Sequence, residues 1–278
     1  MSARLFCFGL GYSARALAAL LCVRGWHVAG TARSTDPVDG IVPIVFDGTA
    51  AMADTSELRQ ATHVLVSVPP GRDGDPVLRW HAEDLKSAPD LRWVGYLSTT
   101  GVYGDRAGGW VDEASPLAAN TVRGRRRVAA ERAWLATGLP VHLFRLAGIY
   151  GPGRNQLETL KAGRAQRIDK PGQVFSRIHV DDIAAVLAAS IERPAPGRAY
   201  NVCDDEAAAP AEVVAFAAAL LGVEPPPLVP FADATMSAMG RSFYADNKRV
   251  ANERIKTELG VRLRYPTYRE GLRTLSRR

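Results

Sequence analysis

The feature that most constrains the fold of this chain is a glycine-rich segment near its start, where a predicted strand meets a predicted helix. The segment reads G-L-G-Y-S-A over residues 9–14, directly after the apolar run Arg4–Phe8. In the spacing G-x-G-x-x-A, Gly9 permits a tight turn, Gly11 lets a ligand approach the backbone, and Ala14 lets the helix pack closely on the strand. The free N–H groups at the start of such a helix attract an anion. The segment therefore predicts a pyrophosphate-binding turn; the alternative is a glycine turn that only joins a strand to a helix.

The rest of the first half alternates strands with helices. This alternation indicates a parallel sheet with helices on both faces, and right-handed crossovers make a doubly wound sheet the default. The fold class that we predict is therefore α/β, a doubly wound parallel sheet of the NAD(P)-binding Rossmann type. The predicted strands lie at 4–8, 27–31, 42–46, 64–68, 93–98 and 141–149, and the predicted helices at 12–24, 55–61, 75–87 and 122–137.

The second half departs from this rhythm after Gly151-Pro152-Gly153. We expect a Rossmann domain over residues 1–150, to which residues 174–203 return, and a smaller C-terminal substrate-binding cap over 151–278. The elements predicted in this half are a strand at 200–202 and helices at 182–192, 211–221 and 247–259, the last of them polar.

The residues that follow the second, third and fourth strands bear on the choice of cofactor. NAD-binding chains usually carry a carboxylate for the ribose 2′-OH at the end of the second strand, whereas Arg33 in that place suits the 2′-phosphate of NADP. We therefore expect NADP, with NAD as the alternative and a solvated loop arginine as the other interpretation of Arg33. Asp47 is placed to meet the adenine edge unless it only forms a turn. Val68 and Pro69 are expected to form a wall beside the cofactor ribose.

Composition limits the other ligand classes. The 35 basic and 29 acidic residues give a net charge of +6, which favours anionic ligands. The basic run Arg123–Arg127 lacks the interleaved aromatic residues or motif of a nucleic-acid site, so nucleic acid is not an expected partner. Three scattered cysteines and five histidines show no metal-ligand spacing, and no metal is expected. We find no long apolar span and no signal-peptide pattern, so we expect a cytoplasmic protein that does not bind a membrane.

Five further segments resemble motifs of the extended short-chain dehydrogenases/reductases, the NAD-dependent epimerase/dehydratase-like family. They follow the family's order over nearly the whole chain. The resemblance implies a catalytic Ser or Thr and a Tyr-x-x-x-Lys pair on the following helix, and Thr99 stands in the hydroxyl position. The segments are Leu97–Gly104 (L-S-T-T-G-V-Y-G), Arg145–Gly153 (R-L-A-G-I-Y-G-P-G, with Leu146 where the family has proline), Ile178–Ala184 (I-H-V-D-D-I-A), Tyr200–Val202 (Y-N-V) and Tyr265–Leu272 (Y-P-T-Y-R-E-G-L).

The Tyr-x-x-x-Lys pair itself is absent. Family helices reach a glutamate four residues past the lysine, and Glu131 fits that place, so Arg127 takes the lysine position and Arg123 the tyrosine position. Arginine stays protonated and cannot act as a general acid or base, although Arg127 can still place a positive charge near the ribose. The alternative for the three residues is a surface ion-pair ladder at i, i+4 spacing. In lacking this pair, the chain resembles an atypical subgroup of the family, the YeeZ-like proteins, which keep the cofactor fold and lack the usual tyrosine.

Other residues are candidates for contact with the substrate. Tyr103 is a substitute proton donor unless it packs beneath the cap, and His179 either titrates near neutrality or fixes the loop before the following helix. Arg145 and Arg154 are expected to hold a substrate phosphate, with a core-edge ion pair as the alternative for Arg145. The full set of predicted residues is Thr99, Tyr103, Arg123 and Arg127 for catalysis; Gly9, Gly11, Tyr12, Ser13, Ala14, Arg33, Asp47, Val68, Pro69 and Arg127 for the cofactor; and Thr100, Arg145, Arg154 and His179 for the substrate.

Two functions follow from these expectations. The first is an NADP-dependent oxidoreductase or epimerase that acts on a small alcohol or carbonyl compound or on a nucleotide sugar. The second is a catalytically inactive regulator that binds NADP without chemistry. The expected partner is a small-molecule substrate, and a homodimer is left open.

Overall fold

The computed structural model describes residues 3–277 and contains one seven-stranded sheet whose paired strands all run parallel. The strand order is β3-β2-β1-β4-β5-β7-β11, so the chain starts in the middle of the sheet, winds to one edge and then to the other. This is the doubly wound Rossmann arrangement, and the predicted fold class is confirmed. The strands are β1 (Arg4–Phe8), β2 (His27–Ala32), β3 (Ile44–Val45), β4 (His63–Val66), β5 (Trp93–Thr99), β7 (Val141–Leu146) and β11 (Ala199–Val202).

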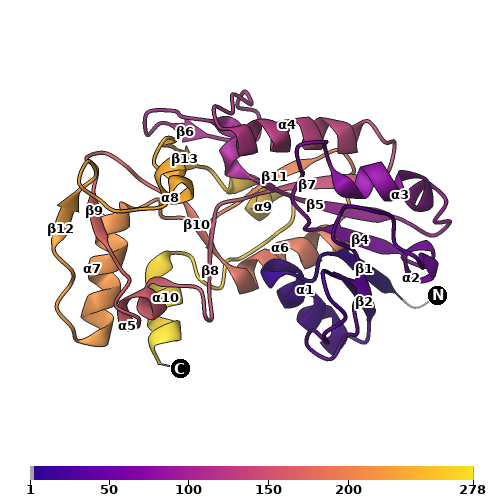
Figure 1. The fold of residues 1–278 in the computed structure, drawn as a ribbon, viewed down its shortest axis with the longest axis horizontal. Helices are drawn as coiled ribbons and strands as arrows, with labels where there is room; N and C mark the ends of the chain where they lie inside the picture. The colour runs from indigo at the N-terminus through magenta and orange to yellow at the C-terminus, as the bar shows by residue number, and fades with distance from the viewer. Residues whose placement is uncertain (1–2, 278) are drawn as a thin grey trace.

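Helices cover both faces of this sheet (Figure 1). Within β1, Leu5 and Cys7 pack into the core on the side of α1 and α6, while Phe6 and Phe8 pack into the core on the side of α3 and α4. Because alternate residues of a strand face opposite sides, a strand buried on both faces must be apolar at every position. The covering helices are α1 (Tyr12–Val23), α2 (Ser56–Arg59), α3 (Pro76–Lys86), α4 (Val122–Leu135) and α6 (Val180–Glu192).

A smaller group of elements lies beyond the carboxyl ends of the strands, at the left of Figure 1. It has its own apolar core, which includes Leu157, Val213 and Leu272. We call this group the cap. Its elements are α5 (Gln156–Lys161), β9 (Arg167–Asp169), α7 (Pro210–Leu221), β12 (Leu228–Pro230), α8 (Ala238–Phe243) and α10 (Tyr268–Ser276).

Short strands connect the sheet to the cap and explain two departures from the predicted elements. The strand expected over 141–149 breaks at Ala147, because β8 (Gly148–Tyr150) leaves the sheet and pairs with β10 (Arg177–His179). The helix expected over 247–259 was wrong in its first part. Residues of β13 (Arg249–Val250) pair with β6 (Trp110–Val111), and only α9 (Glu253–Thr257) is helical. In both places pairing with a distant segment overrides the local pattern.

Within residues 3–277, no helix is long and apolar enough to cross a membrane. The same residues contain no group of three or more His, Cys, Asp or Glu side chains arranged to hold a metal ion.

Candidate cofactor cleft and active-site cavity

A cleft of about 810 Å³ opens at the carboxyl ends of β1, β2 and β4. Ligands of doubly wound folds bind at this edge of the sheet. Six of the residues predicted for the cofactor line it: Gly9, Gly11, Arg33, Asp47, Val68 and Pro69.

The two glycines of the first turn have different reasons to lack a side chain. Gly9 has a φ of +87°, and a Cβ there would lie 2.8 Å from Ser67 Oγ. Gly11 has φ −82° and ψ −175°, which any residue adopts, and a Cβ there would meet only Ser67 Oγ at 3.9 Å. Gly9 is thus required by the backbone, whereas Gly11 keeps a part of the cleft empty. The space above Gly11 lies at the N-terminus of α1, where the free backbone N–H groups of a helix favour an anion.

The charged groups of the cleft differ in whether they already form ion pairs or hydrogen bonds. Arg33 is exposed and has no carboxylate within ion-pair distance among the described residues. Arg79 lies 3.6 Å from Asp73. Asp47 accepts hydrogen bonds from the backbone N–H and the hydroxyl of Thr49, which lower the pKa of its carboxyl. Arg33 is therefore the available cation at the end of β2.

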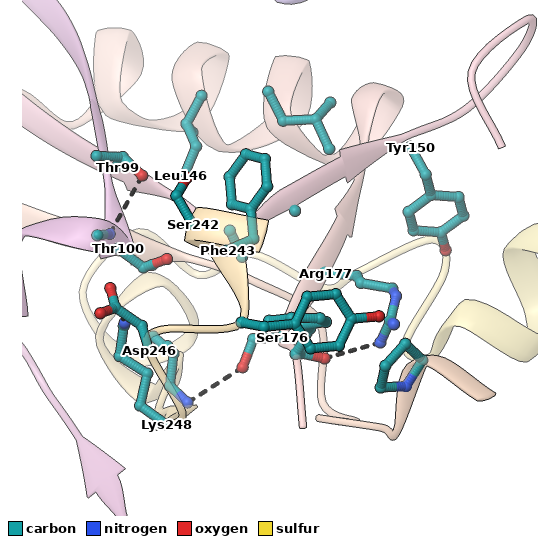
Figure 2. A pocket seen from close by; sticks show the side chains of 18 of the residues that line it. Thr99, Thr100, Leu146, Tyr150, Ser176, Arg177, Ser242, Phe243, Asp246 and Lys248 are labelled. Atoms are coloured by element: carbon teal, nitrogen blue, oxygen red, sulfur yellow. Dashed lines mark hydrogen bonds and ion pairs between the residues drawn. The ribbon is translucent and has the colours of Figure 1, made fainter. Parts of the chain in front are cut away.

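A second cavity, of about 930 Å³, is lined by residues of the sheet edge and of the cap (Figure 2). Pro69 lines both this cavity and the cleft. We call this second cavity the active-site cavity. The predicted residues that line it are Thr99, Thr100, Arg123, Arg127 and Arg154, together with Pro69.

Thr99 ends β5 and caps the short 3-10 helix η1 (Thr100–Tyr103). Its Oγ1 accepts a hydrogen bond of 3.2 Å from the backbone N–H of Gly101. A threonine hydroxyl has one proton to donate, and that proton stays available to an oxygen in the cavity. The placement agrees with a role in orienting a substrate oxygen.

The two arginines predicted to take the Tyr and Lys positions are held differently. Arg127 Nη1 donates to the carbonyl oxygen of Leu97 at 2.7 Å and to Tyr96 Oη at 3.0 Å, so its charge is fixed at the sheet edge. Arg123 is exposed at the start of α4, with its guanidinium 4.8 Å from the ring centre of Phe243. Neither arginine forms an ion pair with Glu131, which pairs with Arg145 instead. The alternative prediction, an ion-pair ladder along the surface of α4, is therefore wrong for these described residues.

Tyr103 and Arg145 lie behind the cavity wall instead of in it, which corrects two expectations. Tyr103 is fully buried, and its hydroxyl donates to Asn201 Oδ1 at 2.7 Å and accepts from Arg145 at 2.9 Å. Burial raises the pKa of Tyr103 to about 12, so this hydroxyl is poorly suited to exchange protons near neutrality. Arg145 pairs with buried Glu131 at 2.8 Å. The core ion pair, left open as an alternative, is the arrangement that the structure shows for Arg145.

The remaining predicted residues line neither the cleft nor the cavity, and they stabilise neighbouring elements of the fold. His179 is also buried away from the cavity, which corrects its expected substrate contact; its Nδ1 accepts from the Asp181 N–H and caps α6. Tyr12 Oη donates to the Pro152 carbonyl oxygen at 2.9 Å and so ties α1 to the start of the cap. Ser13 and Ala14 are buried on α1 below the glycine turn.

Four charged residues of the active-site cavity were not among the residues predicted from the sequence: Arg126, Arg177, Asp246 and Lys248. Lys248 is only 8% exposed, and its Nζ donates to the Gly104 carbonyl oxygen at 2.9 Å and to Asp246 Oδ2 at 3.1 Å. Figure 2 shows Asp246 and Lys248 below Thr99 and Thr100 at the same end of the cavity. No local motif marks Asp246 and Lys248, because they reach the cavity through the pairing of the adjacent strand β13 with β6.

Comparisons with known proteins find relatives that align with nearly the whole chain. No family model matches the chain. Protein YeeZ of Escherichia coli K12 is 30% identical, in an alignment that covers 93% of this chain and 94% of that protein. A conserved protein of unknown function from Silicibacter pomeroyi DSS is 51% identical, with a TM-score of 0.90 and 99% of each chain covered. The human epimerase family protein SDR39U1, solved with NADPH, shares the fold at 19% identity, with a TM-score of 0.77 and 99% of each chain covered.

Proposed function

The chain belongs to the NAD-dependent epimerase/dehydratase family of extended short-chain dehydrogenases/reductases, and we propose that it is an NADP-dependent oxidoreductase or epimerase. The reacting group is an alcohol or carbonyl of a small molecule or nucleotide sugar. The observation that carries this proposal is the shared wall at Pro69. Pro69 lines both the cleft above Gly11 and the cavity that contains Thr99, so the two spaces are adjacent, and a ligand that extends from the glycine turn past Pro69 would end beside the Thr99 hydroxyl.

The residues of the cleft fit a nicotinamide dinucleotide. The pyrophosphate would lie over Gly11 at the start of α1, and Arg33 would meet a 2′-phosphate, because no described carboxylate pairs with it. Arg127 would place its fixed charge near the nicotinamide ribose. When bound, the dinucleotide supplies or accepts the hydride of the reaction.

The proton requires a group that both titrates and reaches the cavity. Tyr103 is enclosed and the arginines do not titrate, whereas Lys248 lines the cavity. An ammonium has three N–H donors, and two of those on Lys248 are engaged, by Gly104 and by Asp246. We assign to the third the transfer of a proton to the substrate oxygen. Thr99 donates a hydrogen bond to the same oxygen, and the neutral amine left on Lys248 is reprotonated from solvent.

The surroundings of Lys248 favour this role. Burial lowers the pKa of its ammonium, which brings it towards neutrality; Asp246 and Asp105 act in the opposite direction and Arg106 acts in the same direction. Lys248 and Thr99 are also tied to the two ends of the same short segment, since Thr99 caps η1 and Lys248 bonds the carbonyl of Gly104 directly after it.

The test is a screen of ketones, aldehydes and nucleotide sugars for NADPH oxidation, followed by two variants. We expect Thr99→Val and Lys248→Met each to lower kcat about 100-fold, the usual range for one acid–base or hydrogen-bonding group. The Kd for NADPH should stay unchanged. Carbonyl reduction should fall as the pH rises through the pKa of Lys248, and Lys248→Met should lack that limb. Lys86→Met, on the exposed end of α3, is the control. Full turnover in either cavity variant would remove that residue from the mechanism.

Cofactor choice is tested at Arg33. Charge-assisted hydrogen bonds contribute about 1.5–3 kcal/mol, so Arg33→Ala should weaken NADP binding about tenfold or more and leave NAD binding nearly unchanged. Calorimetric titration with both cofactors measures this. Arg24→Ala, at the other end of α1, is the control. Equal losses for NADP and NAD would show that Arg33 has a structural role only.

A second candidate function is a regulator that binds NADP without turnover. The observation that favours it is the replacement of the Tyr/Lys pair by Arg123 and Arg127. This function predicts no turnover of any compound in the screen, together with an NADPH-dependent change in oligomeric state in analytical ultracentrifugation. NADPH oxidation by wild-type protein that is lost in Thr99→Val would exclude it.

A further inference from the structure

The cap end of the active-site cavity contains a cation without a carboxylate partner. Arg177, on β10, lines the cavity, and its Nη1 donates to the carbonyl oxygens of Phe175 at 2.8 Å and Ala208 at 3.2 Å. No Asp or Glu of the described chain lies within ion-pair distance of its guanidinium. Figure 2 shows this side chain between Ser176 and Tyr150, on the side of the cavity away from Asp246. Two carbonyls orient the guanidinium but do not neutralise it.

The acid that most strongly interacts with Arg177 is poorly able to balance its charge. Asp204 is buried, and its Oδ2 has no hydrogen-bond partner among the described residues. Burial raises the pKa of Asp204 to about 8, although the charge of Arg177 acts to lower it. Burial therefore disfavours the charged form of Asp204, which also forms no ion pair with Arg177, so the positive charge of Arg177 is poorly balanced in a partly desolvated place.

The rest of the cavity reinforces this charge. Its lining has six basic side chains and one acidic side chain, Asp246, which Lys248 already pairs. A cavity lined mostly by one sign of charge between apolar walls focuses the field and attracts ligands of the opposite sign. The six basic residues are Arg123, Arg126, Arg127, Arg154, Arg177 and Lys248.

Strand register limits how far Arg177 lies from the reacting group. Thr99 pairs with Leu146, and Gly148 pairs with Arg177. Paired strands lie about 4.8 Å apart, and consecutive Cα atoms are about 3.8 Å apart. One can step from Thr99 across to Leu146, along two residues to Gly148, and across to Arg177. The Cα atoms of Thr99 and Arg177 are therefore at most about 17 Å apart. Both side chains reach into the cavity, so a small molecule can contact both.

We propose that the substrate of this cavity carries an oxyanion, a carboxylate or a phosphate, which Arg177 binds at the cap end while the reacting oxygen lies against Thr99. This deepens the proposed function and rests on it for the reaction. The planar guanidinium suits either group, because two of its N–H donors can meet two oxygens. The anion replaces the missing carboxylate partner of Arg177.

The test is anion binding by protein saturated with NADP⁺, which removes the cofactor cleft as a competing site. Inorganic phosphate and acetate are titrated separately by calorimetry, so that the two oxyanions are distinguished. We expect at least one of them to bind wild type, Arg177→Met to weaken it about tenfold or more, and Arg177→Lys to weaken it less. Arg164→Met, an exposed cap arginine outside the cavity, should bind like wild type.

Three results would overturn the proposal: no binding of either anion to wild type, equal binding to Arg177→Met, or an equal loss in Arg164→Met. Should Arg177→Met fail to fold, Arg177→Lys is compared with Arg164→Lys under the same criteria. Binding of NADP⁺ and NADPH turnover are measured on the same samples. Loss of anion binding in Arg177→Met with NADP⁺ affinity retained supports the anion site even if no substrate in the screen turns over, so the two proposals fail separately.

Discussion

The two glycines of the first turn allow folding and cofactor binding to be separated by one matched pair of substitutions. In Gly9→Ala, the new residue must hold a φ of +87°, which costs about 1–2 kcal/mol for any residue with a Cβ. The Cβ would also lie 2.8 Å from Ser67 Oγ, which donates to the carbonyl oxygen of Gly9 at 2.6 Å. Displacing that hydroxyl loses a hydrogen bond of about 1 kcal/mol. We therefore expect Gly9→Ala to lower the free energy of unfolding by about 2–3 kcal/mol.

Gly11→Ala should have the opposite profile. Its backbone is extended and a Cβ has open space, so the free energy of unfolding should change by less than about 0.5 kcal/mol. The methyl group would occupy the part of the cleft assigned to the pyrophosphate. We expect the Kd for NADPH to rise about tenfold or more, which corresponds to about 1.4 kcal/mol.

Urea denaturation of both variants without cofactor gives the two stabilities, and calorimetric titration gives the two Kd values. The reasoning is refuted if Gly11→Ala binds NADPH like wild type, or if it is destabilised as much as Gly9→Ala. Gly11→Val extends the series, because a larger side chain in the same space should abolish binding while the protein remains folded.

Two further predictions concern the buried charges and histidines. Glu131→Gln should lower the free energy of unfolding by about 3–5 kcal/mol, because buried Arg145 would lose its counter-charge; a loss below about 1 kcal/mol in urea denaturation would contradict this. Burial lowers the pKa values of His63 and His142 to about 4, below the value of about 6.5 in an unfolded chain. The unfolded state therefore binds more protons between these values, so stability should be complete above about pH 6.5 and fall as the pH drops towards 4. His142→Gln should make that decline shallower, and an identical pH profile would count against the assignment.

Much of the cofactor half could be predicted from the sequence. The spacing of Gly9, Gly11 and Ala14 defines the turn from a strand into a helix, because both the turn and the packing behind it are local. The alternation of apolar runs with helices gives the parallel sheet. Parallel strands bring their carboxyl ends to one edge, so residues at or directly after a strand end, such as Thr99 and Arg33, could be assigned to this edge from the sequence.

The direction of other side chains near that edge could not be predicted. Tyr103, Arg145 and His179 also lie close to strand ends, yet all three are buried behind the cavity wall. Each meets a partner from a distant part of the chain or caps a helix: Tyr103 bonds Asn201, and Arg145 pairs with Glu131. A motif gives the position of a residue along the chain, but only the packing of the neighbouring elements decides which side of the wall its side chain occupies.

By itself the sequence therefore determined the Rossmann sheet, the glycine turn before α1 and the absence of a Tyr-x-x-x-Lys pair, since each depends on residue identity and short-range spacing. Only the tertiary structure decided that Arg177 and Lys248 join the predicted arginines in the active-site cavity. Lys248 arrives there through the pairing of β13 with β6, and Arg177 through the pairing of β10 with β8. These contacts join segments far apart in the sequence, and the local pattern around Lys248 and Arg177 has no feature that specifies the partner strand. The share of the cavity's charge that Arg177 and Lys248 contribute therefore follows from long-range strand pairing.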